Sequence, residues 1–208
     1  MRNIICLSLI LFLSGCVSIP NSPKSKFYTL KAVSPDNTGE QISLSPGMIL
    51  GVGPVTVPQY LNRPQMVTQD KDGMLKFSEF DRWGEPLELA LTRLLATNLS
   101  TIAAEGNIEV YPWNPVIPVN YQVFADIVRM ESQLNGDMLL VLQWSIIDAQ
   151  ANRMVFTKRF ESRKPISPNN YSGMVEVLSA SFASFSREVA EEVSKLAVQT
   201  KKANNDTN

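Results

Sequence analysis

Cys16 has the most specific chemical context in this chain, because it closes the segment Leu-Ser-Gly-Cys where an apolar run gives way to a Pro- and Ser-rich stretch. A cysteine at such a position could be a disulfide partner, a metal ligand, a nucleophile or an attachment point. Residues 1–15 have the parts of a secretory signal: Arg2 is the positive start, residues 4–13 are the apolar core, and Ser14 and Gly15 form a small-residue cleavage site. The apolar core is too short to cross a hydrocarbon layer of about 30 Å as a helix. A signal is therefore favoured over a buried core helix.

Cleavage before Cys16 removes Cys6 and leaves one cysteine, which cannot form an internal disulfide. The segment resembles a bacterial lipobox, in which the thiol and then the freed amine are acylated. Two or more acyl chains anchor a protein stably, whereas one chain holds it weakly. In lipoproteins with this motif the next residue sorts the product, and Val17 in place of aspartate indicates the outer membrane. Cys16 is therefore predicted to be a lipid anchor.

The chain contains no histidine, which excludes a Ser-His-Asp triad, a Cys-His pair and a histidine-ligated metal. Carboxylates are the remaining catalytic candidates, and Asp81 and Glu85 flank Arg82 and Trp83. As an acid–base pair they would need environments that push their pKa values apart. As residues at a helix start they would instead satisfy free N–H donors and favour the helix dipole. We favour this second interpretation and expect a protein that is not an enzyme and has no cofactor or metal.

The charge balance argues against nucleic acid as a partner. The chain has 19 Lys and Arg against 20 Asp and Glu, and loss of Arg2 with the signal leaves 18 against 20. Such a balance provides no basic surface for a phosphate backbone.

The hydrophobic pattern predicts the elements that would position these residues. Leucine and isoleucine recur at spacings of three and four after Pro86, which predicts an amphipathic helix ending at Gly106. A second helix is predicted over 171–197. Pro54 is expected at an edge or a bulge, and turns are expected at 70–73 and 135–136. Alternating and β-branched runs predict strands over 27–30, 48–57, 64–70, 74–80, 108–111, 121–133, 138–148 and 153–161.

These elements predict an α+β fold, an antiparallel-rich mixed sheet with two main amphipathic helices packed on it. The predicted organisation is a signal peptide at 1–15, a lipidated cysteine and flexible tether at 16–26, a single domain at 27–199 and a polar tail at 200–208. Fully extended, the tether spans about 33 Å.

The segment 56–69 is the strongest candidate for binding. Pro58 and Pro64 frame Tyr60, Leu61 and Arg63 in a stiffened loop. Tyrosine and arginine dominate binding hot spots, and loops on a rigid frame often carry function. The alternative is a packed structural turn with Tyr60 half-buried, and the residues alone do not decide between the two.

Three stretches together resemble a known family: "FYTL" after a lipidated N-terminus, "ILGVGPVTVPQYLNRPQMV" and "FDRWGEPLELALTRLLATNL". In this order they resemble the PqiC (YmbA-like) family, the ABC-type transport auxiliary lipoproteins of MCE lipid-transport systems. The resemblance implies an α+β protein anchored in the outer membrane on its periplasmic side, with a PqiB-like MCE protein and a PqiA-like inner-membrane protein as partners. It also implies assembly into a homo-oligomeric ring and a role in lipid transport and envelope integrity, and it supplies no catalytic residues.

The resulting hypothesis is a tethered adaptor that docks the periplasm-spanning MCE protein to the outer membrane. The candidate contact residues combine suitable chemistry with a place in the resembling motifs, and they are Tyr60, Leu61, Arg63, Arg82 and Trp83. Two alternatives stay open. The domain could bind lipid itself, with a fatty chain between helices and sheet, or it could be a carboxylate-dependent enzyme acting on the cell wall.

Overall fold

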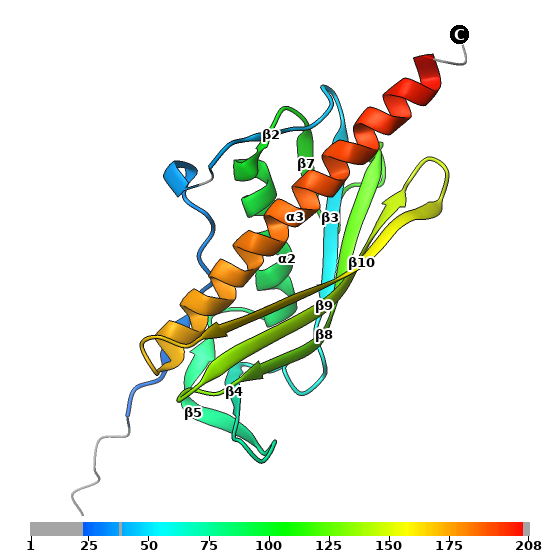
Figure 1. Ribbon diagram of the computed structural model, residues 1–208. Coiled ribbons are helices and arrows are strands. Elements are labelled where there is room, and N and C mark those ends of the chain that lie inside the picture. Colours follow the sequence, from blue (N-terminus) through cyan, green and yellow to red (C-terminus); the bar gives the residue numbers. More distant parts are fainter. Residues whose placement is uncertain (1–22, 38, 206–208) are drawn as a thin grey trace, which may run out of the picture.

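The computed structural model describes residues 23–37 and 39–205, so the predicted signal and Cys16 lie outside the described residues. The fold is α+β, as predicted, and its sheets are mixed: the long pairings of β9 with β10 and β8 are antiparallel, whereas β3 pairs in parallel with both β8 and β7. A twisted five-stranded sheet has the order β10-β9-β8-β3-β7, and α2 and α3 cover one of its faces (Figure 1). The bounds of these elements are β3 Ile49–Thr56, α2 Leu87–Ile102, β7 Asn107–Val110, β8 Tyr121–Ser132, β9 Asp137–Asp148, β10 Arg153–Pro165 and α3 Tyr171–Asn205.

Two smaller sheets complete the structure. The first has the order β1-β5-β4, with β1 Lys26–Tyr28, β4 Gln65–Gln69 and β5 Leu75–Trp83. The second pairs β2 Ile42–Ser43 with β6 Ala103–Ala104, and a 3-10 turn, η1, covers Pro35–Asn37. The predicted turn between β4 and β5 is present, and the Asp70 carboxylate accepts hydrogen bonds from the backbone N–H groups of Asp72 and Met74.

β9 is buried on both faces, as its continuous apolar run predicts. Its inward residues, including Trp144, pack against Phe182 and Phe185 of α3 in one continuous core. Its outward residues Leu139 and Val141 are also buried, although α2 and α3 both lie on the opposite face. They lie in register between charged residues of β8 and β10, whose aliphatic stems shield them.

A bulge interrupts the pairing of β3 with β8. The register with β8 shifts between Val52 and Val55, so Pro54 lies at a bulge, as predicted. Thr92 of α2 fills the site: its Oγ1 accepts a hydrogen bond from the Val55 N–H at 3.0 Å and donates to the Glu88 carbonyl at 2.8 Å. A side chain at Gly53 would collide with the Thr92 methyl group.

The predicted end of the first helix is wrong. α2 ends at Ile102, and Ala103 is already extended because it begins the short strand β6, which pairs with β2. Gly106 has a positive φ of 88°, as a left-handed cap would, but it serves the turn into β7. A tertiary strand pairing therefore overrides the local helix signal.

Candidate functional site

The segment between β3 and β4 is a compact turn. Backbone N–H groups of Leu61 and Asn62 donate to the carbonyls of Pro58 and Gln59, at 2.9 and 3.1 Å. Leu61 is 2% exposed and belongs to the hydrophobic core. Its side chain therefore fixes the turn from inside.

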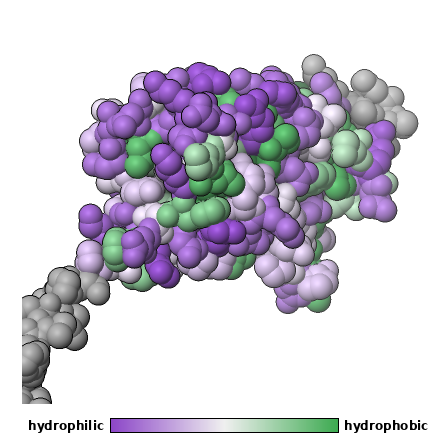
Figure 2. Space-filling view, turned by 90° about the horizontal axis from the view of Figure 1, so that it is seen from below, coloured by the Kyte–Doolittle hydropathy of each residue, from purple (hydrophilic) through white to green (hydrophobic). Residues whose placement is uncertain are grey.

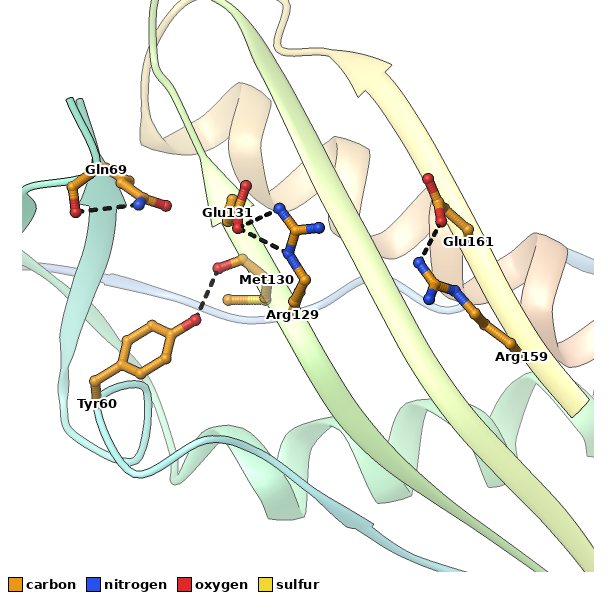
Figure 3. A network of polar contacts seen from close by, with 8 residues as sticks. Tyr60, Gln69, Arg129, Met130, Glu131, Arg159 and Glu161 are labelled. Atoms are coloured by element: carbon orange, nitrogen blue, oxygen red, sulfur yellow. Dashed lines mark hydrogen bonds and ion pairs between the residues drawn. The ribbon is translucent and has the colours of Figure 1, made fainter. Parts of the chain in front are cut away.

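Tyr60 links this turn to the large sheet. Its hydroxyl donates to the Met130 carbonyl of β8 at 3.4 Å (Figure 3). The pairing of β3 with β8 ends at Thr56 and Asp126, so the Met130 carbonyl lies beyond the last residue of β8 that pairs with β3. Tyr60 donates a hydrogen bond to this carbonyl instead. Burial raises the pKa of the Tyr60 hydroxyl, and the nearby Glu131 adds to this effect. The half-buried tyrosine matches the structural alternative considered above.

Trp83 and the proline-framed turn enclose a pocket. Trp83 is 5% exposed and packs into the core, while its backbone N–H donates to the Pro64 carbonyl at 2.8 Å. The pocket has a volume of about 320 Å³ and is lined by Asn62, Arg63, Pro64, Trp83, Gly84, Glu85 and Pro86. The structure thus brings Arg63 and Trp83 together at one site although they are distant in sequence.

Arg63 and Arg82 are the predicted contact residues with accessible side chains. The Arg63 guanidinium lies over the Phe77 ring, 4.2 Å from its centroid. Arg82 is in register with Gln65 on one side and Phe27 on the other. The structure separates the two arginines, which are partly exposed, from the buried Leu61 and Trp83.

The acidic residues nearby have structural partners. Asp81 accepts hydrogen bonds from the Tyr28 hydroxyl at 2.8 Å and from Ser78 Oγ at 2.9 Å, which fixes a bulge in β5 and ties β1 to it. Burial, reinforced by Asp81, raises the pKa of Tyr28 to about 12. Glu85 forms an ion pair with Arg93 of α2 at 2.8 Å. Asp81 and Glu85 thus each have a structural partner, but neither caps α2: Asp81 lies in β5, and the N-terminus of α2 has no side-chain cap hydrogen bond. The predicted role of the two carboxylates in satisfying free N–H donors at the helix start is therefore wrong.

Within residues 23–37 and 39–205, no group of three or more Cys, Asp or Glu residues is placed to hold a metal ion. No helix in these ranges combines the length and apolarity needed to cross a bilayer.

The sequence reasoning missed two aromatic residues at this end of the molecule. Phe27 is 68% exposed and Phe77 is 47% exposed, and both lie on the small three-stranded sheet beside the arginines. The sequence predicts Phe27 only as part of the strand 27–30. The signal that could have found it is its place directly after the tether, where a solvent-facing phenyl ring needs an explanation.

Comparison with known proteins gives a consistent picture. The family model for the ABC-type transport auxiliary lipoprotein component matches residues 28–190. The intermembrane transport lipoprotein PqiC of Escherichia coli K12 is 25% identical over 187 residues, which cover 89% of this chain and 94% of that protein; PqiC of Shigella flexneri matches equally.

Two crystal structures share the fold. One, of an uncharacterized protein, has a TM-score of 0.64 at 20% identity and covers 83% of this chain and 100% of the other. The second, of a protein from Xanthomonas campestris, has a TM-score of 0.60 at 15% identity and covers 86% and 99%.

Proposed function

Because the chain belongs to the family of ABC-type transport auxiliary lipoprotein components, we propose that it is the outer-membrane adaptor of an MCE-type lipid-transport system. The observation that carries this proposal is the family match over 28–190, preceded in the same chain by the lipobox-like segment ending at Cys16. In this role the domain faces the periplasm, docks the periplasm-spanning MCE protein and supports envelope integrity. The name of the E. coli relative, an intermembrane transport lipoprotein, agrees with transport between two membranes.

The proposed anchor is Cys16 with its acyl chains. Support comes from the motif, from the small residues before the cysteine and from the family description. Labelled palmitate should enter the wild-type protein, and the product should fractionate with the outer membrane. A mature protein without label, found free in the periplasm, would contradict the anchor.

The proposed partners are a PqiB-like MCE protein and, through it, a PqiA-like inner-membrane protein. A homo-oligomeric ring of this chain would offer a closed, ring-shaped binding surface to the distal end of a tubular partner. Chemical crosslinking in intact cells, followed by identification of the attached proteins, tests both. Recovery of an MCE protein and of multiples of this chain is expected.

The proposed contact region is the turn around Tyr60 and the neighbouring part of β5. Leu61 and Trp83 shape this region from the core, so its accessible chemistry comes from Tyr60, Arg63 and Arg82. Alanine at buried positions would confuse lost binding with lost folding, and a photo-crosslinking residue at an exposed position avoids this problem.

Asn62 is the test position and Val116 the matched control. Both residues are exposed, but they lie near opposite ends of β3. Asn62 is in the turn that follows the strand, and Val116 is in the loop 111–120, which lies beside the first residues of the strand. Capture of the MCE protein from position 62 and not from 116 is expected. Capture from 116 alone would move the contact to the other end and exclude the predicted residues.

The alternative of a lipid carrier has a specific difficulty. The space between the helices and the large sheet is filled by Trp144, Phe182 and Phe185, all buried. A fatty chain at that place would have to displace them. Mass spectrometry of gently purified protein should therefore find no stoichiometric lipid, and finding one would favour the carrier.

A further inference from the structure

The outer face of the small sheet β1-β5-β4 carries two phenyl rings and two arginine side chains: Phe27, Phe77, Arg63 and Arg82. We infer that this face lies against the membrane surface, where the two guanidinium groups bind phosphates of phospholipid headgroups and the rings enter the headgroup layer. The inference rests on the proposed anchoring at Cys16. It gives Arg63 and Arg82 a lipid ligand in place of the protein contact considered for them above, so that contact would fall to Tyr60 and the turn at Asn62.

Strand register places these residues on one face. Phe27 of β1 and Gln65 of β4 are both directly opposite Arg82 of β5, so the three side chains point to the same side of the sheet. Phe77 of β5 is opposite Val67, which follows Gln65 by two residues in β4, so Phe77 has the same direction. Arg63 lies in the turn before β4, and its guanidinium lies over the Phe77 ring. The four residues therefore form one surface drawn from three separate segments.

The two guanidinium groups have no anionic partner within residues 23–37 and 39–205. Two arginines on the surface of the large sheet have acidic partners: Arg129 pairs with Glu131 and Arg159 with Glu161, each at 2.7 Å (Figure 3). Arg63 makes only its ring contact, and the buried Nε–H of both Arg63 and Arg82 lacks an acceptor. A partly buried guanidinium without an acceptor is under-satisfied, and phosphate fits its planar donor set.

The short segment between Cys16 and β1 keeps this face close to the membrane. Phe27 follows the predicted anchor by only 11 residues, so even a fully extended tether keeps β1 within about 36 Å of Cys16. Lys24 and Lys26, both exposed, add positive charge at the same end. Residues 24–28 and 63–83 together contain six basic and four acidic residues, a net charge of +2, which suits a negatively charged surface.

Exposed aromatic rings favour lipid over a protein carboxylate as the occupant. Phenyl rings combined with basic residues are the composition of interfacial membrane contacts. Figure 2 shows this end of the molecule, where hydrophobic side chains are gathered among hydrophilic ones. A salt bridge to a protein would explain the arginines but would leave Phe27 in water.

Depth-dependent fluorescence quenching on the full mature lipoprotein tests the inference. The one mature cysteine is acylated in this proposal, so a cysteine introduced by Met74→Cys, at the exposed tip of the β4–β5 turn, is a unique label site. Val116→Cys is the control label. The proteins are reconstituted into vesicles of phosphatidylethanolamine and phosphatidylglycerol that carry a headgroup-attached quencher.

Quenching is expected at position 74 and not at 116. In R63Q/R82Q the ratio of membrane-apposed to detached domain should fall about 25-fold, since each basic residue at an anionic surface contributes about fivefold. The matched double variant R129Q/R159Q removes the same charge from the large sheet and should leave the quenching unchanged. Circular dichroism melting confirms that all variants fold.

The outcomes separate the two proposals. Wild type that fails to float with the vesicles refutes the anchoring and hence the proposed function. Wild type that floats without quenching at position 74 overturns the membrane-facing sheet alone. Equal quenching in both double variants overturns the phosphate contact. Unchanged quenching with loss of the crosslink to the MCE protein in R63Q/R82Q assigns the arginines to a protein interface instead.

Discussion

Thr92→Val should destabilise the protein although it changes neither the size nor the shape of the side chain. Thr92 is buried, and its hydroxyl is the acceptor for the Val55 N–H at the β3 bulge, where the strand has lost its ladder partner. Valine leaves that N–H buried and without an acceptor. An orphaned buried donor costs about 1–3 kcal/mol. For a domain of this size the melting temperature should fall by about 2–4 °C per kcal/mol.

Two variants isolate the hydrogen bond. Thr92→Ser keeps the acceptor but removes the methyl group that lies over Gly53, which should cost about 0.8 kcal/mol. Thr97→Val makes the same chemical change on the same helix: the Thr97 hydroxyl also donates to a carbonyl four residues earlier, but it is exposed and accepts no strand N–H. Its effect should stay within about 0.5 kcal/mol.

Urea unfolding followed by tryptophan fluorescence gives the ranking. We expect wild type and Thr97→Val to be most stable, Thr92→Ser lower and Thr92→Val lowest, with unchanged dependence on urea concentration. Hydrogen exchange should show the Val55 amide opening faster in Thr92→Val alone. If Thr92→Val were as stable as Thr97→Val, the bulge would not depend on this bond and the argument would be wrong.

Three further predictions concern the attachment of the N-terminal segment. The folded Tyr28 hydroxyl has a pKa of about 12, above the ordinary value of 10. Its contribution to stability is therefore complete below pH 10 and is lost as the pH rises toward 12. Between pH 10 and 12 the free energy of unfolding of wild type should fall, and that of Tyr28→Phe should fall less. Asn98→Ala removes the acceptor of the Val33 N–H, so exchange of the Val33 amide should accelerate while amides in the sheet core remain protected, and uniform acceleration would contradict a local role. Cys16→Ser should abolish incorporation of labelled palmitate in cells, and persistent labelling would place the acyl chain elsewhere.

The sequence predicted those parts of the fold that depend on local patterns. The meander β8-β9-β10, the turn at Asp70 to Gly73 and both helices follow from periodicity and turn residues that are close together in the chain. The bulge at Pro54 was predictable because proline lacks the ladder donor. Non-local pairings were not predictable: β6 replaced the expected end of α2, and no periodicity indicates that two residues will pair with β2.

The candidate site was predicted in outline and not in its chemistry. The proline-framed turn is where the sequence placed it, but Leu61 and Trp83 are buried because the turn folds back onto the core. Whether a leucine in a short loop faces inward depends on packing that single residues do not encode. The pairing of Phe27 with Arg82 is likewise invisible in sequence, since 55 residues separate them.

The way the chain enters the domain determines how it carries tension. β1 runs parallel to β5, and the segment after it crosses both helices, where the Lys31 N–H donates to Ser179 of α3 and the Val33 N–H to Asn98 of α2. A force that pulls on β1 from its N-terminal side, along the strand, acts in shear on all the hydrogen bonds between β1 and β5 at once. The hydrogen bonds from Lys31 and Val33 to the two helices bear part of the same force. A force applied at the N-terminal end of the domain would thus be distributed over the small sheet and both helices, so that their bonds would not break one at a time.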